Sequence, residues 1–258
     1  PPHLPGIIIL VHGVNSTGEW FSVAEKKLCE GLNKRLGLTG TSYELETNKY
    51  LFDDKIDAVP LMSRDLPDAN INKSPVIRFY WGYASSKGNE DRYIIPLANK
   101  KGVDYHQLKR ENMPYANIMA QGPFFWGGGP FQNGTNNLHS LWSEKGFKER
   151  VGGVKVQWFN EDKDRLLTNA PPRKYYAHAA KRLADMVDSI RNKYPKDTVT
   201  IISHSQGTMI AMAAVAIAKN APDALFLLNS PYALDHNDLN GASLPADECI
   251  SPEGRQNT

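Results

Sequence analysis

The chain has 258 residues, of which 41% are hydrophobic and 22% are charged, and its formal net charge is +2. This length and apolar content allow one large core, so we expect residues 1–258 to form a single α/β domain. The small net charge argues against a nucleic-acid-binding protein, and no apolar run approaches the 18 or so residues of a transmembrane helix.

Little in the termini or the cysteines points to an extracellular disulfide fold. Cys29 and Cys249 are too few for a disulfide framework, which favours synthesis in a reducing cytosol, and Cys29 is expected to be a small buried residue. The chain starts with PPHLPG, without a signal peptide or initiator Met, and ends with SPEGRQNT. We expect it to be a piece of a longer protein.

The first predicted element is a buried strand over residues 6–11, which are continuously apolar after the glycine and rich in β-branched side chains. An HG turn after an early strand is where α/β-hydrolases place one donor of the oxyanion hole. Gly13 permits the close backbone approach, and we expect the Val14 N–H to be that donor. His12 precedes any candidate nucleophile, against the usual order of serine, acid and histidine, so it is expected to be structural.

A helix is predicted next, over residues 20–36, with Ser16 or Thr17 as its cap and Gly37 as its stop. Its buried stripe is predicted to consist of Val23, Leu28, Leu32 and Leu36. A buried strand over residues 75–81 follows.

Residues 83–150 interrupt this alternation and are expected to be a large aromatic-rich insertion, peaking in GPFFWGGGPF. Aromatic side chains are costly to leave in water, so this segment is predicted to be a cap or lid that meets acyl chains or a membrane interface. The alternative is a structural loop anchored by its aromatic residues. Asp162 and Asp164, which follow the insertion, are expected to be solvated, and neither a metal site nor a cofactor is predicted.

The clearest amphipathic helix spans residues 175–194, between Pro172 and Pro195. Its buried stripe is predicted to be Tyr176, Ala179, Leu183, Val187, Ile190 and Tyr194. A strand over residues 224–229 is expected later in the chain. The alternation of strands and helices predicts a mostly parallel sheet with helices on both faces, in an α/β-hydrolase-like fold.

Between the helix over residues 175–194 and the strand over residues 224–229, the sequence of residues 199–218 is VTIISHSQGTMIAMAAVAIA. It predicts a strand, a turn that contains serine, and a helix. This pattern is typical of the nucleophile elbow of serine hydrolases, with Ser205 as the nucleophile and the Gln206 N–H as an oxyanion donor. Ser203 replaces the usual glycine of G-x-S-x-G, while Gly207 fits it. The alternative is a buried strand that runs into a core helix through a polar turn, but the early HG turn favours the elbow.

The rest of the catalytic triad is harder to place. Asp235 is the candidate acid, since some lipases place it after the strand that follows the elbow, and His236 is the only histidine after Ser205. Successive side chains diverge in extended chain, so these two residues do not easily serve one triad. We therefore expect the hydrolase sheet to be incomplete here. The catalytic histidine is then expected in sequence that this chain lacks, with the acid either Asp235 or in the same missing part.

Three segments, ISHSQGTMIAMAA, IILVHGVNSTGEWF and VIRFYWGY, resemble the antibacterial lipase effectors of bacterial type VI secretion, in particular those with an α/β-hydrolase core and a large aromatic insertion. The resemblance implies a protein made in the bacterial cytoplasm, delivered by the type VI spike proteins, and hydrolysing membrane phospholipids in the periplasm of a competitor. It also implies a cognate immunity protein. The resemblance further implies that Ser205 is the nucleophile of this chain and that Gln206 and Val14 supply its oxyanion hole.

The sequence thus predicts a serine lipase or phospholipase that acts through an acyl-enzyme on Ser205. One alternative is an esterase or thioesterase for small substrates, which a preference for short acyl chains would reveal. Another is a non-catalytic binding module on a hydrolase scaffold, in which Ser205 would be inert.

Overall fold

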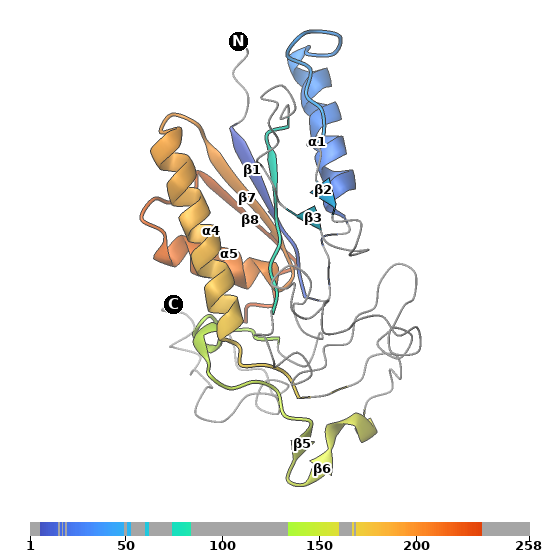
Figure 1. Ribbon diagram of the computed structural model, residues 1–258, viewed down its shortest axis with the longest axis vertical. Coiled ribbons are helices and arrows are strands. Elements are labelled where there is room, and N and C mark those ends of the chain that lie inside the picture. The colour runs from blue at the N-terminus through green and yellow to red at the C-terminus, as the bar shows by residue number, and fades with distance from the viewer. Residues whose placement is uncertain are drawn as a thin grey trace.

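A computed structural model describes residues 6–14, 16, 18, 20–48, 51–52, 60–61, 74–83, 134–159, 167 and 169–233. Its centre is a four-stranded parallel sheet in the order β4-β1-β7-β8 (Figure 1). The strands are β1 (Ile7–Val11), β4 (Val76–Phe79), β7 (Val199–His204) and β8 (Ala224–Leu228). The long helices are α1 (Phe21–Leu36), α4 (Lys174–Lys193) and α5 (Gly207–Ile217). The predicted mostly parallel α/β sheet is confirmed.

The register brings the ends of the central strands to one edge of the sheet. Val11, the last residue of β1, lies opposite Ser203, and His204, the last residue of β7, lies opposite Leu228. Because parallel strands share one direction, the turns that follow β1, β4 and β7 meet at the same edge. This carboxyl edge is where open α/β sheets bind ligands.

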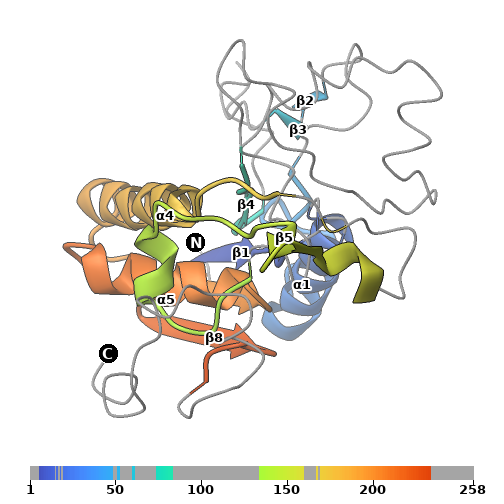
Figure 2. The same ribbon diagram turned by 90° about the horizontal axis from the view of Figure 1, so that it is seen from below.

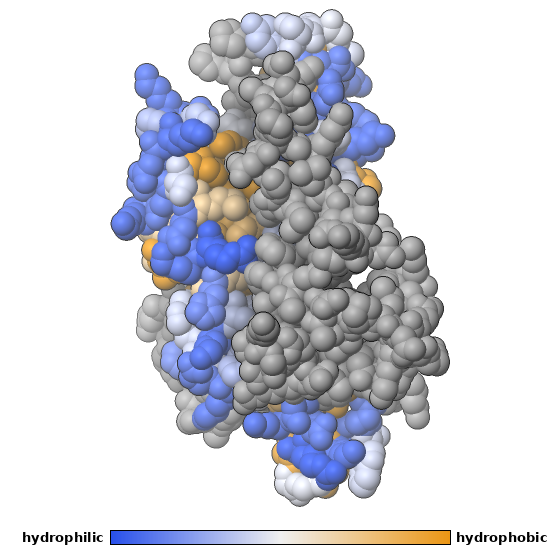
Figure 3. Space-filling view, in the orientation of Figure 1, coloured by the Kyte–Doolittle hydropathy of each residue, from blue (hydrophilic) through white to orange (hydrophobic). Residues whose placement is uncertain are grey.

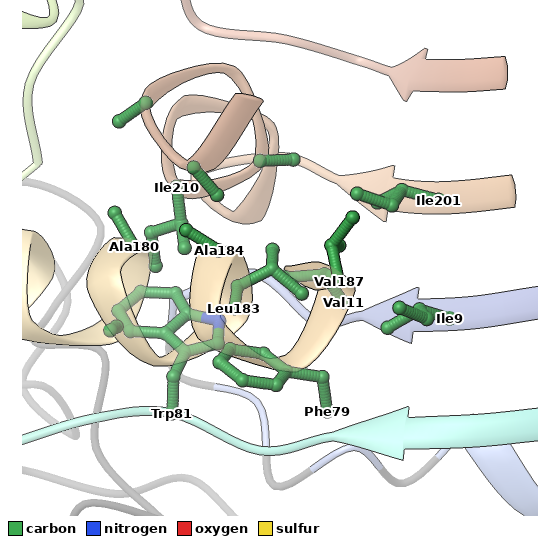
Figure 4. Packing of buried hydrophobic residues seen from close by; sticks show 14 of the residues in the cluster. Ile9, Val11, Phe79, Trp81, Ala180, Leu183, Ala184, Val187, Ile201 and Ile210 are labelled. Atoms are coloured by element: carbon green, nitrogen blue, oxygen red, sulfur yellow. The ribbon is translucent and has the colours of Figure 1, made fainter. Parts of the chain in front are cut away.

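Helices cover both faces of the sheet, as predicted (Figure 2). Alternate residues of β1 point to opposite faces: Ile9 and Val11 belong to a core under α4 and α5, whereas Ile8 and Leu10 pack with Phe21 of α1. The larger core is shown in Figure 4, where labelled side chains from the sheet and both helices interdigitate: Ile9, Val11, Phe79, Trp81, Ala180, Leu183, Ala184, Val187, Ile201 and Ile210.

The predicted stripe of α1 is wrong in part. The buried side chains are Phe21, Glu25, Cys29 and Asn33. Val23 is 59% exposed and Leu36 is 39% exposed, while Leu28 and Leu32 are partly buried. Two of the four buried positions are therefore polar, and each has a hydrogen-bond partner outside the helix.

Glu25 and Asn33 anchor α1 to the rest of the fold. Glu25 Oε2 accepts hydrogen bonds from Nε and Nη2 of Arg78 in β4, both at 2.7 Å, and the Glu25 and Arg78 side chains are 0% and 9% exposed. Asn33 exchanges two hydrogen bonds with the backbone of Leu45, at 2.8 and 2.9 Å. Both buried groups are thereby satisfied, which explains why polar residues occupy the inner face.

The ends of α1 and α4 were predicted with mixed success. Gly37 ends α1 in the left-handed region at φ 65°, as expected. Ser16 does not cap α1: the helix starts after Trp20, and Ser16 Oγ instead accepts the Gly18 N–H at 3.1 Å. Thr17 lies outside the described residues. The predicted stripe of α4 is confirmed except for Tyr194, which follows the helix and is 45% exposed.

The insertion is described only in its last part. Residues 84–133, with the aromatic peak, lie outside the described residues. The segment that returns to the core contains a one-turn helix, η1 (His139–Trp142). Four short strands form two further antiparallel pairs: β2 (Leu51–Phe52), β3 (Pro60–Leu61), β5 (Arg150–Val151) and β6 (Val154–Lys155).

The β5–β6 hairpin was missed by the sequence analysis. Its loop is Gly152-Gly153, with φ values of 57° and 84°. Positive φ at both loop residues matches the type I′ turn that two-residue hairpins favour. The signal was present in the sequence as Val-Gly-Gly-Val. A second one-turn helix, η2 (Val156–Phe159), follows directly.

Among the described residues, no helix is both long and apolar enough to cross a membrane.

Candidate active site

Ser205 has the backbone conformation of a nucleophile elbow. Its φ is 52°, a value that non-glycine residues rarely adopt. The Ser205 N–H donates to the Leu228 carbonyl at 2.9 Å, and the Ser205 carbonyl accepts both the Thr208 N–H (2.9 Å) and the Thr208 hydroxyl (2.6 Å). A strained residue persists only when surrounding contacts hold it in place. Here the backbone N–H and the carbonyl of Ser205 are both hydrogen-bonded.

The small residue two positions after Ser205 is required by the packing. A Cβ added to Gly207 would lie 2.2 Å from the carbonyl oxygen of His12, which is backbone and cannot move aside cheaply. The start of α5 therefore rests directly on the end of β1. This contact brings the positive end of the α5 dipole to the turn after β1.

The serine two positions before Ser205 also has a structural reason. Ser203 is fully buried, and its Oγ donates a hydrogen bond to the Phe226 carbonyl at 3.0 Å. A serine side chain is thus small enough for the elbow and satisfies its own hydroxyl within the sheet. The departure from G-x-S-x-G leaves the turn intact.

The early HG turn lies against the nucleophile. A Cβ added to Gly13 would lie 2.9 Å from Ser205 Cβ and 3.4 Å from Ser205 Oγ. Two motifs from opposite ends of the chain therefore meet, as the sequence predicted they would. Val14 follows directly and packs partly against the main core. Within the described part of the chain, neither the Val14 N–H nor the Gln206 N–H donates a hydrogen bond.

His12 is a structural residue, as expected. It is fully buried and stacks on the Trp81 ring at 5.3 Å between centroids. Its Nε2 accepts the Trp81 backbone N–H at 3.2 Å, and its Nδ1 lies 2.7 Å from the Gly13 carbonyl oxygen. Since Nε2 accepts, the proton sits on Nδ1, and the ring is neutral. The Trp81 indole N–H completes the link by donating to the His12 carbonyl at 2.7 Å.

The side chain of Gln206 connects the elbow to the end of the insertion. It is 3% exposed, and its Oε1 accepts the Thr135 backbone N–H at 3.3 Å. The next residue, Asn136, accepts the Ala233 N–H through its carbonyl at 3.1 Å. From the sequence, only the backbone N–H of Gln206 is assigned a role. No motif signals this contact, because it depends on where the insertion returns.

The candidate acid and the last histidine, Asp235 and His236, lie outside the described residues, as do Asp162 and Asp164. His204 is exposed at the end of β7. Among the residues that the structure describes, no histidine makes a hydrogen bond with Ser205. The same residues contain no group of three or more side chains arranged to hold a metal ion.

Comparison with known proteins identifies the family. Residues 4–258 match the family described as the T6SS Tle3 phospholipase effector domain, where T6SS is the type VI secretion system. The chain is 32% identical over 255 residues to the antibacterial effector protein Tle3 of Pseudomonas aeruginosa. That alignment covers 91% of this chain and 34% of the relative, so the chain spans about a third of the relative's length. The resemblance carried by the elbow, the HG turn and the segment VIRFYWGY is confirmed, and the chain belongs to the family of T6SS Tle3 phospholipase effector domains.

Proposed function

We propose that this chain is the catalytic domain of a serine phospholipase, which cleaves ester bonds of membrane phospholipids through an acyl-enzyme on Ser205. The observation that carries the proposal is the left-handed Ser205 held in contact with Gly13. Membership of a phospholipase effector family supports the substrate class. The proposal favours a phospholipase over an esterase for small substrates and over a non-catalytic module.

The proposed reaction is acyl transfer. A base removes the proton from Ser205 Oγ, and the oxygen attacks the ester carbonyl of the lipid. The oxyanion of the tetrahedral intermediate accepts hydrogen bonds from the N–H groups of Val14 and Gln206. The alcohol part of the lipid then leaves with a proton, and water releases the fatty acid. Each donor contributes roughly 3–4 kcal/mol to lowering the barrier.

The acid and the base of the catalytic triad are proposed from the sequence alone. Asp235 is the proposed acid, and the histidine is either His236 or one supplied by a longer protein. In the second case, further strands extend the sheet beyond β8, whose side chains Phe226, Leu227 and Leu228 are exposed. An apolar strand at the edge of a parallel sheet favours this arrangement, because such strands are ordinarily covered.

The biological role that we propose is the one suggested by membership of the effector family. We propose delivery by type VI secretion, action on phospholipids in the target periplasm, and protection of the producer by an immunity protein. The name of the relative, an antibacterial effector, supports this role. We also propose that residues 83–150 form a cap on a single domain, because the described end of the insertion binds the elbow through Thr135 and Gln206.

The proposal is tested by labelling with a fluorophosphonate, followed by mass mapping, in this chain and in a longer protein that contains it. We expect Ser205 to be modified in the longer protein; modification in this chain as well would identify His236 as the base. Ser205→Ala is expected to abolish both labelling and phospholipid hydrolysis while the fold is retained. Ser203→Gly, two residues earlier in β7, restores the common G-x-S-x-G pattern and is expected to keep labelling. Turnover by Ser205→Ala would overturn the assignment. Greater activity on short soluble esters than on diacyl phospholipids would instead indicate an esterase.

A further inference from the structure

The hairpin tip, defined as residues 150–159, exposes apolar side chains to an unusual degree. Trp158 is 77% exposed and Phe159 is 78% exposed, and Val151 and Val154 of the hairpin are exposed as well. Large aromatic side chains are seldom left so open, and a group of them commonly marks an interaction site.

Basic side chains accompany the apolar ones. Arg150 and Lys155 lie opposite each other in the hairpin, Lys148 precedes it, and all three are exposed. Arg150 Nη1 donates to the Gly153 carbonyl at 3.1 Å, which holds that side chain along the hairpin. Figure 3 shows hydrophobic and hydrophilic residues side by side in the part of the surface that projects at the bottom.

The base of the tip is fixed by hydrogen bonds. The Val156 N–H donates to the Glu149 carbonyl at 2.9 Å, and the Glu149 N–H donates to Asn169 Oδ1 at 3.1 Å. The Leu167 N–H donates to Gln157 Oε1 at 2.7 Å. The exposed residues are therefore presented on an ordered support.

The tip projects from the end of the molecule that holds Ser205. The segment before it is tied to the start of α4, where the Arg173 N–H donates to the Lys145 carbonyl and the Lys174 N–H to the Ser143 carbonyl, at 3.1 and 3.0 Å. α4 leads directly into β7 and runs against it, so its start lies at the carboxyl edge of the sheet. Figure 1 shows β5 and β6 beyond this edge.

We propose that the hairpin tip docks on an anionic phospholipid surface, with Trp158 and Phe159 in the interface and Arg150 and Lys155 at the headgroups. Aromatic rings beside basic side chains are the combination that binds such interfaces. The inference rests on the proposed function, because docking at this edge presents Ser205 to its lipid substrate. Covering of the tip by another part of a longer protein, or by a second copy of the chain, is an alternative that the test distinguishes.

The test measures binding to phosphatidylglycerol–phosphatidylethanolamine vesicles by flotation, in a Ser205→Ala background that prevents hydrolysis. Replacing Trp158 and Phe159 together by serine is expected to weaken partitioning at least about tenfold, since each ring buries apolar surface at the interface. The matched control replaces Tyr43 and Tyr194 by serine. These two aromatic residues are exposed and follow the C-terminal ends of α1 and α4. The control is expected to bind normally. Equal binding by the two double variants would overturn the proposal.

Two further measurements separate docking from a structural role. Brominated lipids are expected to quench fluorescence from Trp158, and Trp158→Phe is expected to lose that quenching while it keeps most of the binding. Arg150→Gln with Lys155→Gln is expected to weaken binding to anionic vesicles and to leave the weaker binding to phosphatidylcholine unchanged. No quenching that depends on Trp158, or a change of oligomeric state in the tip variant with unchanged vesicle binding, would overturn docking.

The failure of docking is distinguishable from the failure of the proposed function. With Ser205 intact, turnover of a soluble short ester is expected to be equal in the tip variant and the control. If Ser205 is not labelled and yet the tip variant loses vesicle binding, docking stands and the nucleophile assignment fails. If Ser205 is labelled and the tip variant binds vesicles normally, the nucleophile assignment stands and docking fails.

Discussion

At the scale of single residues, the described site depends on contacts that leave no room for a side chain. Gly13 faces Ser205, and Gly207 faces the His12 carbonyl. Both contacts join the end of β1 to the elbow that follows β7. Because the Ser205 backbone is already in a strained region, small displacements at these contacts move the hydroxyl that we propose to react.

We therefore expect Gly13→Ala to lower turnover on soluble esters by roughly a hundredfold, the loss typical of a misplacement of about 1 Å. The new methyl group would have to displace Ser205, whose Cβ lies 2.9 Å from its position. The matched control is Gly31→Ala in α1, where an added Cβ meets nothing within 4 Å. That substitution is expected to keep activity and to stabilise the helix by up to about 1 kcal/mol in urea unfolding. Full activity in Gly13→Ala would contradict the close approach of Gly13 to Ser205.

Between elements, α1 is joined to β4 by the buried pair of Glu25 and Arg78. Removing one partner leaves the other charge buried and unpaired. We expect Glu25→Ala to lower the free energy of unfolding by about 3–5 kcal/mol, measured by urea denaturation. Glu30→Ala on the same helix, which removes an exposed pair with Lys27, is expected to leave the unfolding midpoint unchanged. Similar losses in the two variants would refute the special role of the buried pair.

A second link joins the starts of β7 and β8 and is sensitive to pH. The Val199 N–H donates to Asp223 Oδ2 at 2.6 Å, and this bond, together with the neighbouring Arg191, holds the pKa of Asp223 below its ordinary value. A lowered folded-state pKa stabilises the fold above the unfolded-state pKa, and this stabilisation is lost as pH falls through the folded-state pKa.

We therefore expect Asp223→Asn to reduce the free energy of unfolding at pH 7 and to have progressively less effect as the pH falls below about 4. Urea unfolding of both proteins across this range measures the difference. Asp197→Asn, a nearby exposed position, serves as the control. A difference that stays constant down to the lowest pH would show that the carboxylate charge is not involved.

Some of these turns and contacts could be predicted from the sequence, and others could not. The elbow and the HG turn were predictable because tight backbone turns demand small residues at fixed spacing, and the strands because they are rich in apolar and β-branched side chains. The buried stripe of α1 was not, since the buried polar groups of Glu25 and Asn33 depend on partners outside the helix, Arg78 of β4 and the backbone of Leu45. The link between Gln206 and Thr135 likewise depends on where a long insertion returns. The β5–β6 hairpin could have been predicted from its two glycines.

At the scale of the whole molecule, the described structure has two ends with different chemistry. The carboxyl edge of the sheet gathers Ser205, Gly13 and the end of the insertion, and the hairpin tip extends from it. The opposite end holds the stop of α1 at Gly37 and the link at Asp223. Ser205, Gly13 and the hairpin tip therefore lie together at one end, away from the links at the other.

The exposed strand β8 has a practical consequence for handling the protein. Its backbone is paired with β7 on one side, and Phe226, Leu227 and Leu228 are exposed. An apolar outer strand of this kind is a template for pairing with the strands of other molecules, and it promotes aggregation when concentration rises. Expression of this chain alone is thus expected to yield self-associating material. Solubility is expected to improve when lysine replaces Phe226.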